Sequence, residues 1–120
     1  MKRDFNLIRR IMIDIQNIPA GNPCQNLSYP GEYDRATIVE HIALLIEEGL
    51  VKGEIYQVWP GNSFLIDGLT WKGHDFIEAA KDDSIWLKAT KTLFLPTVSI
   101  TFDLLLQWLK AEAKQKLGLP

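Results

Sequence analysis

The segment from residue 33 to residue 70 constrains the fold most strongly, because a helix pattern there is followed directly by two strand patterns. Apolar residues recur at helical spacing over 34–48, and Gly49 is well placed to end the helix. Two stretches rich in aromatic and β-branched residues follow, 54–59 and 63–69, separated by Pro60-Gly61-Asn62. This order predicts a winged helix, a fold that reads nucleic acid and is also used for protein contacts.

The remaining patterns predict four more helices and no further long strand. Helical spacing of apolar residues covers 4–17, 71–81, 85–94 and 101–117. Between the first helix and residue 33, a stretch rich in proline and glycine is unsuited to a long helix, and Leu27 and Tyr29 suggest a very short strand. We expect an α+β, mostly helical chain: a winged-helix-like domain with a β-hairpin wing and additional C-terminal helices.

Size and composition bound the class of protein. With 120 residues and 47% hydrophobic composition, the chain is predicted to form one domain over 1–120, with a core at 1–70 and C-terminal helices at 71–120. A formal net charge of -2 provides no global positive field for nucleic acid or anionic membranes. Cys24 is the single cysteine, which excludes an intramolecular disulfide, and no apolar run reaches the roughly 18 residues of a membrane span. A cytoplasmic location is expected.

Several short segments together carry a family resemblance. They are Met1-Lys2-Arg3-Asp4 with Leu7-Ile8-Arg9, residues 41–50, residues 69–76, Asp82-Asp83 with Trp86, Phe102-Asp103, and Lys116-Leu117-Gly118-Leu119. In combination, and over nearly the whole chain, they resemble the bacterial and prophage family called domain of unknown function 2513. The resemblance implies winged-helix-like character and a bacterial or phage origin. It implies no catalytic residue.

The charge of the helix in the DNA-reading position opposes DNA binding. Over 34–48, Arg35 is the one basic residue against four acidic ones, which leaves a net charge of -3. Glu40 and Glu47 fall on the face opposite the apolar stripe of Ile38, Ile42 and Leu45, so the acidic face is predicted to be exposed and to repel phosphate. The loop before this helix also leaves the supporting helix of a helix-turn-helix short or absent.

A nucleic-acid surface would have to be local. The candidate contact residues are Arg9, Arg10, Arg35, Lys52 and Trp59. Basic residues spread in this way are also typical of a solvated surface. Aromatic residues in a hairpin usually pack across the strands, although Trp59, beside the turn, fits that alternative least well.

No arrangement of residues indicates an enzyme, a cofactor or a metal. His74 and Asp75 are adjacent and therefore point in different directions on a helix. Asp82-Asp83 is suited to cap a helix, and Cys24, His41 and His74 lack zinc-site spacing. We therefore expect a non-enzymatic protein without a cofactor, and the roles of Cys24 and His74 stay open.

The last predicted helix is the candidate protein interface. Leu105, Leu106, Trp108 and Leu109, with Leu104, form a nearly all-apolar run that suggests a symmetric dimer, although packing within the monomer is an equal alternative. We expect a regulatory or adaptor module that contacts another protein or a second copy of itself. The alternative is a DNA-binding transcription regulator of phage or prophage type.

Overall fold

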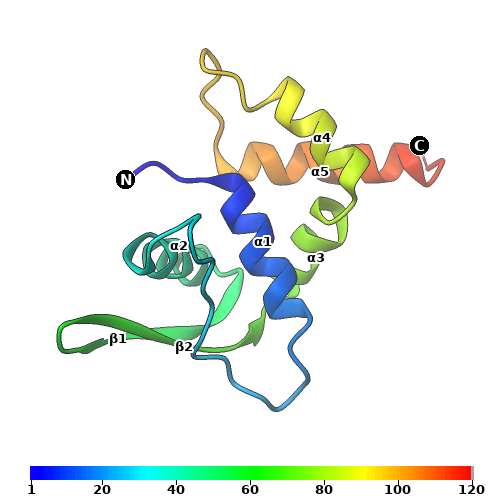
Figure 1. Cartoon of the computed structure of the whole chain (residues 1–120). Helices are drawn as coiled ribbons and strands as arrows, with labels where there is room; N and C mark the ends of the chain where they lie inside the picture. The colour runs from blue at the N-terminus through cyan, green and yellow to red at the C-terminus, as the bar shows by residue number, and fades with distance from the viewer. Residues whose placement is uncertain (120) are drawn as a thin grey trace. The chain divides into compact units, whose positions relative to one another are not determined.

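The computed structural model describes residues 1–119, which fold into five helices and one antiparallel hairpin (Figure 1). In chain order the elements are α1 (Phe5–Gln16), α2 (Arg35–Glu47), β1 (Val51–Val58), β2 (Gly61–Leu69), α3 (Trp71–Ala80), α4 (Asp83–Thr92) and α5 (Phe102–Lys116). The predicted α+β class is confirmed, but helices cover about half of the chain rather than most of it. No helix among the described residues has the length and apolar content needed to cross a membrane.

The main chain divides into two compact units, one over residues 1–74 and one from Asp75 onward. The division lies within α3, four residues beyond the subdivision predicted at residue 70. Whether the chain behaves as one folding domain stays a prediction.

Side-chain caps explain where the helices begin. Asp4, Asp34, Asp82 and Thr101 precede α1, α2, α4 and α5, and each accepts a backbone hydrogen bond from the residue three positions later. Thr70 acts in the same way for α3, because its hydroxyl accepts the N–H of Gly73 at 3.0 Å. These bonds satisfy donors that have no partner within the helix. For this reason, the five helices begin within two residues of their predicted starts.

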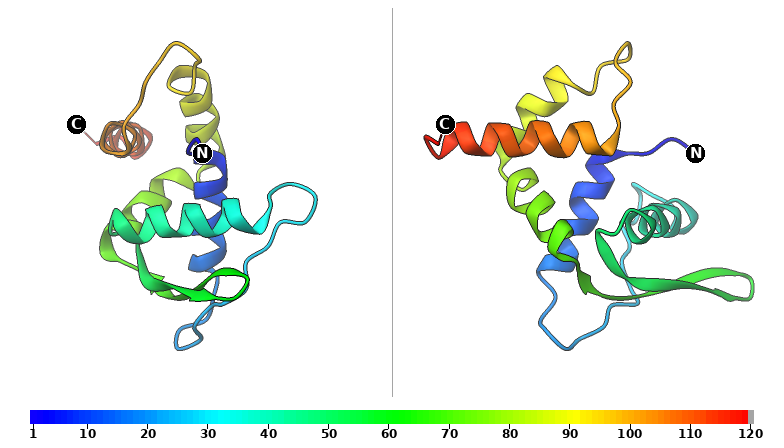
Figure 2. Two further views of the ribbon diagram at one scale, coloured as in Figure 1. Left: turned by 90° about the vertical axis from the view of Figure 1, so that its left-hand side faces the viewer. Right: turned by 180° about the vertical axis from the view of Figure 1, so that it is seen from behind.

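In the first unit, α1 and α2 pack against each other and against the hairpin (Figure 2). The predicted stripe of Ile38, Ile42 and Leu45 is buried, whereas Glu40 and Glu47 are exposed. The apolar stripe therefore faces the core and the carboxylates face solvent, as the periodicity predicts.

The hairpin departs from the prediction at both ends. β1 begins at Val51 rather than at residue 54, because Val51 pairs with Leu69 and a bulge between Lys52 and Gly53 keeps the ladder continuous. At the other end, Val58 pairs with Gly61, so the turn is Trp59-Pro60, joined by a cis peptide bond, rather than Pro60-Gly61-Asn62. Pairing of Gly61 and Asn62 extends β2 into the predicted turn.

The loop between α1 and α2 contains no helix. Its predicted strand at Leu27 and Tyr29 is wrong, because Cys24 instead forms the one backbone bridge to β2, with both hydrogen bonds to Ile66 at 2.9 Å. A bridge between Tyr29 and Tyr33 closes a single turn immediately before α2.

The second unit is built on the pairing of α4 with α5 and on aromatic contacts. The Phe76 and Phe102 rings lie 5.2 Å apart between centroids. Lys116 bonds Asp82, the cap of α4, and Lys88 bonds Glu112 at 2.8 Å. Hydrogen bonds from Lys116, Ser84 and Ile85 hold the pKa of Asp82 well below its usual range.

Candidate binding groove

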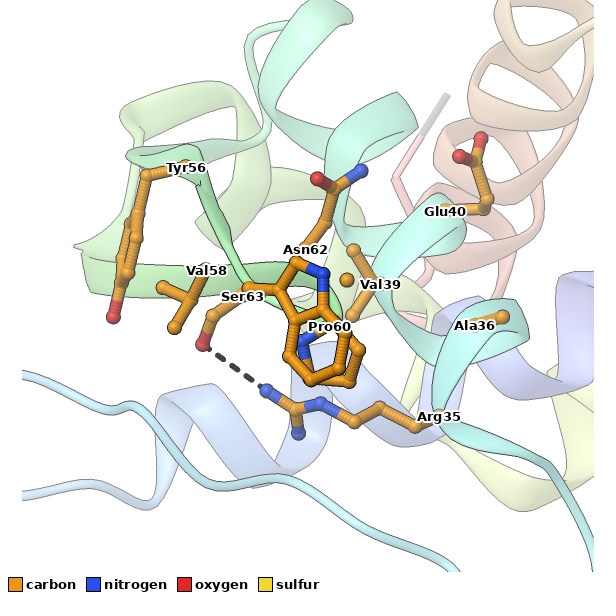
Figure 3. A pocket seen from close by; sticks show the side chains of 11 residues that line it. Arg35, Ala36, Val39, Glu40, Tyr56, Val58, Pro60, Asn62 and Ser63 are labelled. Atoms are coloured by element: carbon orange, nitrogen blue, oxygen red, sulfur yellow. Dashed lines mark hydrogen bonds between the residues drawn. The ribbon is translucent and has the colours of Figure 1, made fainter.

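A groove of about 550 Å³ lies between the first turns of α2 and the outer half of the hairpin. In Figure 3, Arg35, Ala36, Val39 and Glu40 come from α2, whereas Tyr56, Val58, Pro60, Asn62 and Ser63 come from the hairpin. Trp59 and Gly61 complete the lining. We call this feature the wing groove.

Arg35 joins the two sides of the wing groove. It is the first residue of α2, and its guanidinium donates a hydrogen bond to Ser63 Oγ at 3.0 Å (Figure 3). The guanidinium carbon also lies 5.5 Å from the centre of the Phe64 ring, within the range of a cation–π contact. Asp34 fixes this end of α2, and its hydrogen bonds with Thr37 lower the pKa of the Asp34 carboxyl. Polar contacts at the start of α2 therefore stabilise this wall of the groove and join it to the hairpin.

Apolar side chains at the hairpin tip are left open to solvent. Trp59 is 93% exposed and Val58 is 51% exposed, whereas Phe64, farther along the same hairpin, is fully buried. The tip therefore presents a large aromatic side chain beside an apolar hollow.

The wing groove is electrostatically mixed rather than basic. Arg35 is its one basic lining residue and is already bonded to Ser63. Glu40 lines the same groove, is exposed, and forms no ion pair within residues 1–119. Farther along α2, Glu47 adds negative charge to the exposed face. The groove has no cluster of cations to neutralise a run of phosphates.

The candidate nucleic-acid contacts are not gathered at one place. Arg35 and Trp59 line the wing groove, but Arg9, Arg10 and Lys52 do not. Arg10 pairs with Glu32 at 2.5 Å and stacks over the Tyr29 ring at 4.3 Å, and the Glu32 hydrogen bond raises the pKa of the Arg10 guanidinium. Arg9 is half-buried on α1.

Lys52 lines a second, smaller pocket at the base of the hairpin. This pocket has a volume of about 260 Å³ and is formed by the end of α1, the loop after it, the hairpin base and α3. Asp67 and His74 also line it. The side chains of Lys52, Asp67 and His74 form no hydrogen bond or ion pair with any residue that the structure describes. We call this feature the base pocket.

His41 has a structural role. It is fully buried, its Nε2 accepts the N–H of Asp4 at 2.9 Å, and its Nδ1 lies 2.8 Å from the carbonyl oxygen of Thr37. Nδ1 must therefore carry the proton. The Tyr33 hydroxyl donates to Asp4 at 2.7 Å, so one cluster ties the start of α1 to α2 and to the loop.

The remaining residues singled out for chemistry are dispersed. Cys24 is buried and its thiol donates to the carbonyl oxygen of Asn26. Asp82 is engaged as a helix cap and ion-pair partner. Within residues 1–119, no group of three potential metal-ligating side chains comes together.

The predicted interface on α5 stays a prediction, and most of its residues are buried within the chain. Leu105 and Leu109 have no exposed surface, Leu106 is 8% exposed, and Trp108 is half-buried. Most of the apolar run is thus buried by packing within the chain. A partner could contact these leucines only by displacing the residues that cover them. Leu104 is the member of the run that stays open, at 54% exposed.

Sequence reasoning missed most of the wing groove. Ala36, Val39, Val58, Asn62 and Ser63 attract no notice singly, and their proximity arises from contacts between α2 and the hairpin. One signal was present: Val58-Trp59-Pro60 is apolar where hairpin turns are usually polar. An apolar turn of this kind indicates a surface that is available for contact with another molecule.

Comparison with known proteins identifies relatives by sequence. A family model described as "Hypothetical protein (DUF2513)" matches residues 2–99. An "Uncharacterized protein" of Haemophilus influenzae is 25% identical over 119 residues, which cover 98% of this chain and 100% of the relative. No solved structure matches the chain.

Proposed function

This chain belongs to the DUF2513 family, and we propose that it is a non-enzymatic winged-helix-like module that binds another protein through the wing groove. The observation that carries the proposal is the 93% exposure of Trp59 beside the apolar hollow. Tryptophan is among the residues that contribute most to binding energy in protein interfaces. A protein that binds another protein without catalysing a reaction would have a regulatory or adaptor role.

The order of elements supports the winged-helix part of the proposal. The chain begins with a helix, which is followed by a single bridge to the hairpin at Cys24. A second helix and then a two-stranded wing come next. The single turn at Tyr29–Tyr33 takes the place of the supporting helix. A module shortened in this way loses the element that crosses the DNA backbone, which favours use of the wing for protein contact.

Charge sets the chemistry of the partner. Glu40 lines the groove and Glu47 lies farther along α2, and both are exposed. A segment that places an apolar side chain against Trp59 and a lysine or arginine near Glu40 would match both features. Complementary charge speeds association and selects against acidic partners.

Site-specific crosslinking tests this proposal. A photoreactive amino acid at position 59, compared with the same amino acid at position 71, should crosslink a partner in extracts of the source organism. Trp71 is the matched control because it is also in the first unit and is 86% exposed but lies outside the groove.

Binding of the purified partner then decides the outcome. Trp59→Ala should weaken affinity at least about thirtyfold, as for an interface hot spot of about 2 kcal/mol, whereas Trp71→Ala should leave it unchanged. The bound segment should contain an apolar residue flanked by basic ones. Equal crosslinking from both positions, or equal affinity of the two variants, would reject the wing groove as the contact site.

The second candidate is a DNA-binding transcription regulator. It is favoured by the exposed position of Arg35 in the first turn of α2, the helix that would enter the major groove. In that case Arg9, Arg10 and Lys52 would contact phosphate. Affinity for random duplex DNA that falls steeply between about 50 and 200 mM salt would establish it. Absence of binding at low salt would remove it.

A further inference from the structure

The base pocket brings together three ionisable side chains that have no partner within residues 1–119. Lys52 comes from β1, Asp67 from β2 and His74 from α3, all within the first unit. All three residues are exposed to solvent, so their charged groups are accessible from outside the protein. Lys52 and Asp67 carry opposite charges and line the same pocket without pairing with each other. Both side chains are therefore available to bind a ligand.

The pocket's walls restrict the ligand further. Ile15, Ile66 and Leu69 are buried residues that line its apolar side. Its volume of about 260 Å³ lies below the roughly 300–1,000 Å³ of pockets that hold drug-sized ligands. The ligand is therefore small, partly apolar, and matched to one negative and one positive side chain.

The bulge of the hairpin creates this arrangement. Lys52 pairs with Gly68, and Gly53 pairs with Ile66, so Asp67 is the extra residue of β2 that has no partner on β1. Gly68 has φ of +152°, a backbone conformation that other residues rarely adopt. A bulge often redirects a side chain at a functional site.

We propose that the base pocket binds a free aliphatic α-amino acid. Asp67 receives the ammonium group, Lys52 and His74 receive the carboxylate, and the apolar wall receives the side chain. This site is separate from the wing groove, because the two share no lining residue. A failure here therefore leaves the proposed protein contact untouched, and the reverse also holds.

Calorimetric titration of the full chain with L-leucine tests the proposal. We expect saturable binding of one molecule per chain. The matched probes 4-methylpentanoate, which lacks the ammonium group, and 3-methylbutylamine, which lacks the carboxylate, should each bind at least about tenfold more weakly, because each loses a charge-assisted contact.

Variants separate the pocket from the rest of the surface. Asp67→Asn and Lys52→Gln should each weaken leucine binding at least about tenfold. Glu54→Gln, on β1 but outside the pocket, should bind as the wild type does. The proposal is overturned by no saturable heat up to about 10 mM leucine, by wild-type affinity in Asp67→Asn and Lys52→Gln, or by equal affinity for 4-methylpentanoate, which would indicate a simple anion site.

Discussion

The two ends of the β-hairpin differ in what surrounds them. At the base, Val51 and Leu69 pair with each other and are almost fully buried. At the tip, Val58 pairs with Gly61 and is 51% exposed, and Trp59 beyond it is 93% exposed. The same ladder therefore serves stability at one end and is available for contact at the other. The contrast predicts that substitutions at the base change folding, whereas substitutions at the tip change binding.

The largest effect is expected from Ile66→Ala at the base. Ile66 is 1% exposed and carries both backbone hydrogen bonds to Cys24. Removing its side chain should lower the free energy of unfolding by about 2–5 kcal/mol, measured by urea denaturation. Val58→Ala, the matched change at the tip, should alter it by less than about 0.5 kcal/mol. Equal losses would erase the contrast.

Gly73→Ala should also destabilise, although glycine-to-alanine changes within helices usually stabilise. A Cβ atom at residue 73 would lie 2.1 Å from the carbonyl oxygen of Leu50, beside the base of the hairpin. Overpacking of this kind costs about 1–3 kcal/mol, which exceeds the roughly 1 kcal/mol that alanine gains in helix propensity. Thermal unfolding measures the balance, and a raised Tm would show that α3 can move away from Leu50.

Alkaline pH should destabilise the loop between α1 and α2, which bridges to the base of the hairpin at Cys24. Burial and the hydrogen bond to Asp14 raise the pKa of Tyr29, so the folded state favours the neutral phenol. The resulting stability is fully present below the unfolded pKa of about 10 and is lost as pH rises through the folded pKa. Tyr29→Phe should cost about 1 kcal/mol at neutral pH and reduce the pH dependence above about pH 10.

The control for the alkaline experiment is Tyr56→Phe. The Tyr56 hydroxyl forms no hydrogen bond with any described residue, so this variant should retain the wild-type pH dependence. Tyr33 contributes in the same direction as Tyr29, because its hydrogen bond to Asp4 raises its pKa. Urea denaturation across pH 7 to about 11 gives the comparison. Identical profiles for wild type and Tyr29→Phe would remove Tyr29 as the cause.

The smallest effect on stability is expected from Trp59→Ala. With 93% of its surface exposed, this side chain should contribute less than about 0.5 kcal/mol to folding. Circular dichroism and urea denaturation should therefore match the wild type even where partner binding is lost. A loss of several kcal/mol would mean that the tip belongs to the folded core.

Local signals explain which parts of the molecule were predictable. The caps Asp34 and Asp82 and the buried stripe on α2 are encoded within a few residues, and their predicted positions are confirmed. The family resemblance is also confirmed over residues 2–99. Pairing across strands is less local: the turn at Trp59-Pro60 depends on Val58 meeting Gly61, which residue preferences alone do not specify.

The sites were the least predictable part, because their residues are distant in sequence. Arg35 meets Ser63 across 28 positions, and Lys52, Asp67 and His74 come from three elements. For α5, the sequence showed more apolar residues than one helix face needs, but it did not show which residues pack against them. Leu105 and Leu109 are buried within the chain, so the same pattern that suggests an interface also fits a core.

The bonding of His41 provides a natural reporter for nuclear magnetic resonance. Its imidazole is fixed as the Nδ1–H tautomer by two main-chain partners, Asp4 and Thr37. Detachment of the amino-terminal segment would free Nε2 and change its ¹⁵N chemical shift. The ring of His41 could therefore show, without a foreign probe, whether a bound macromolecule or small molecule alters the way the polypeptide's beginning is held.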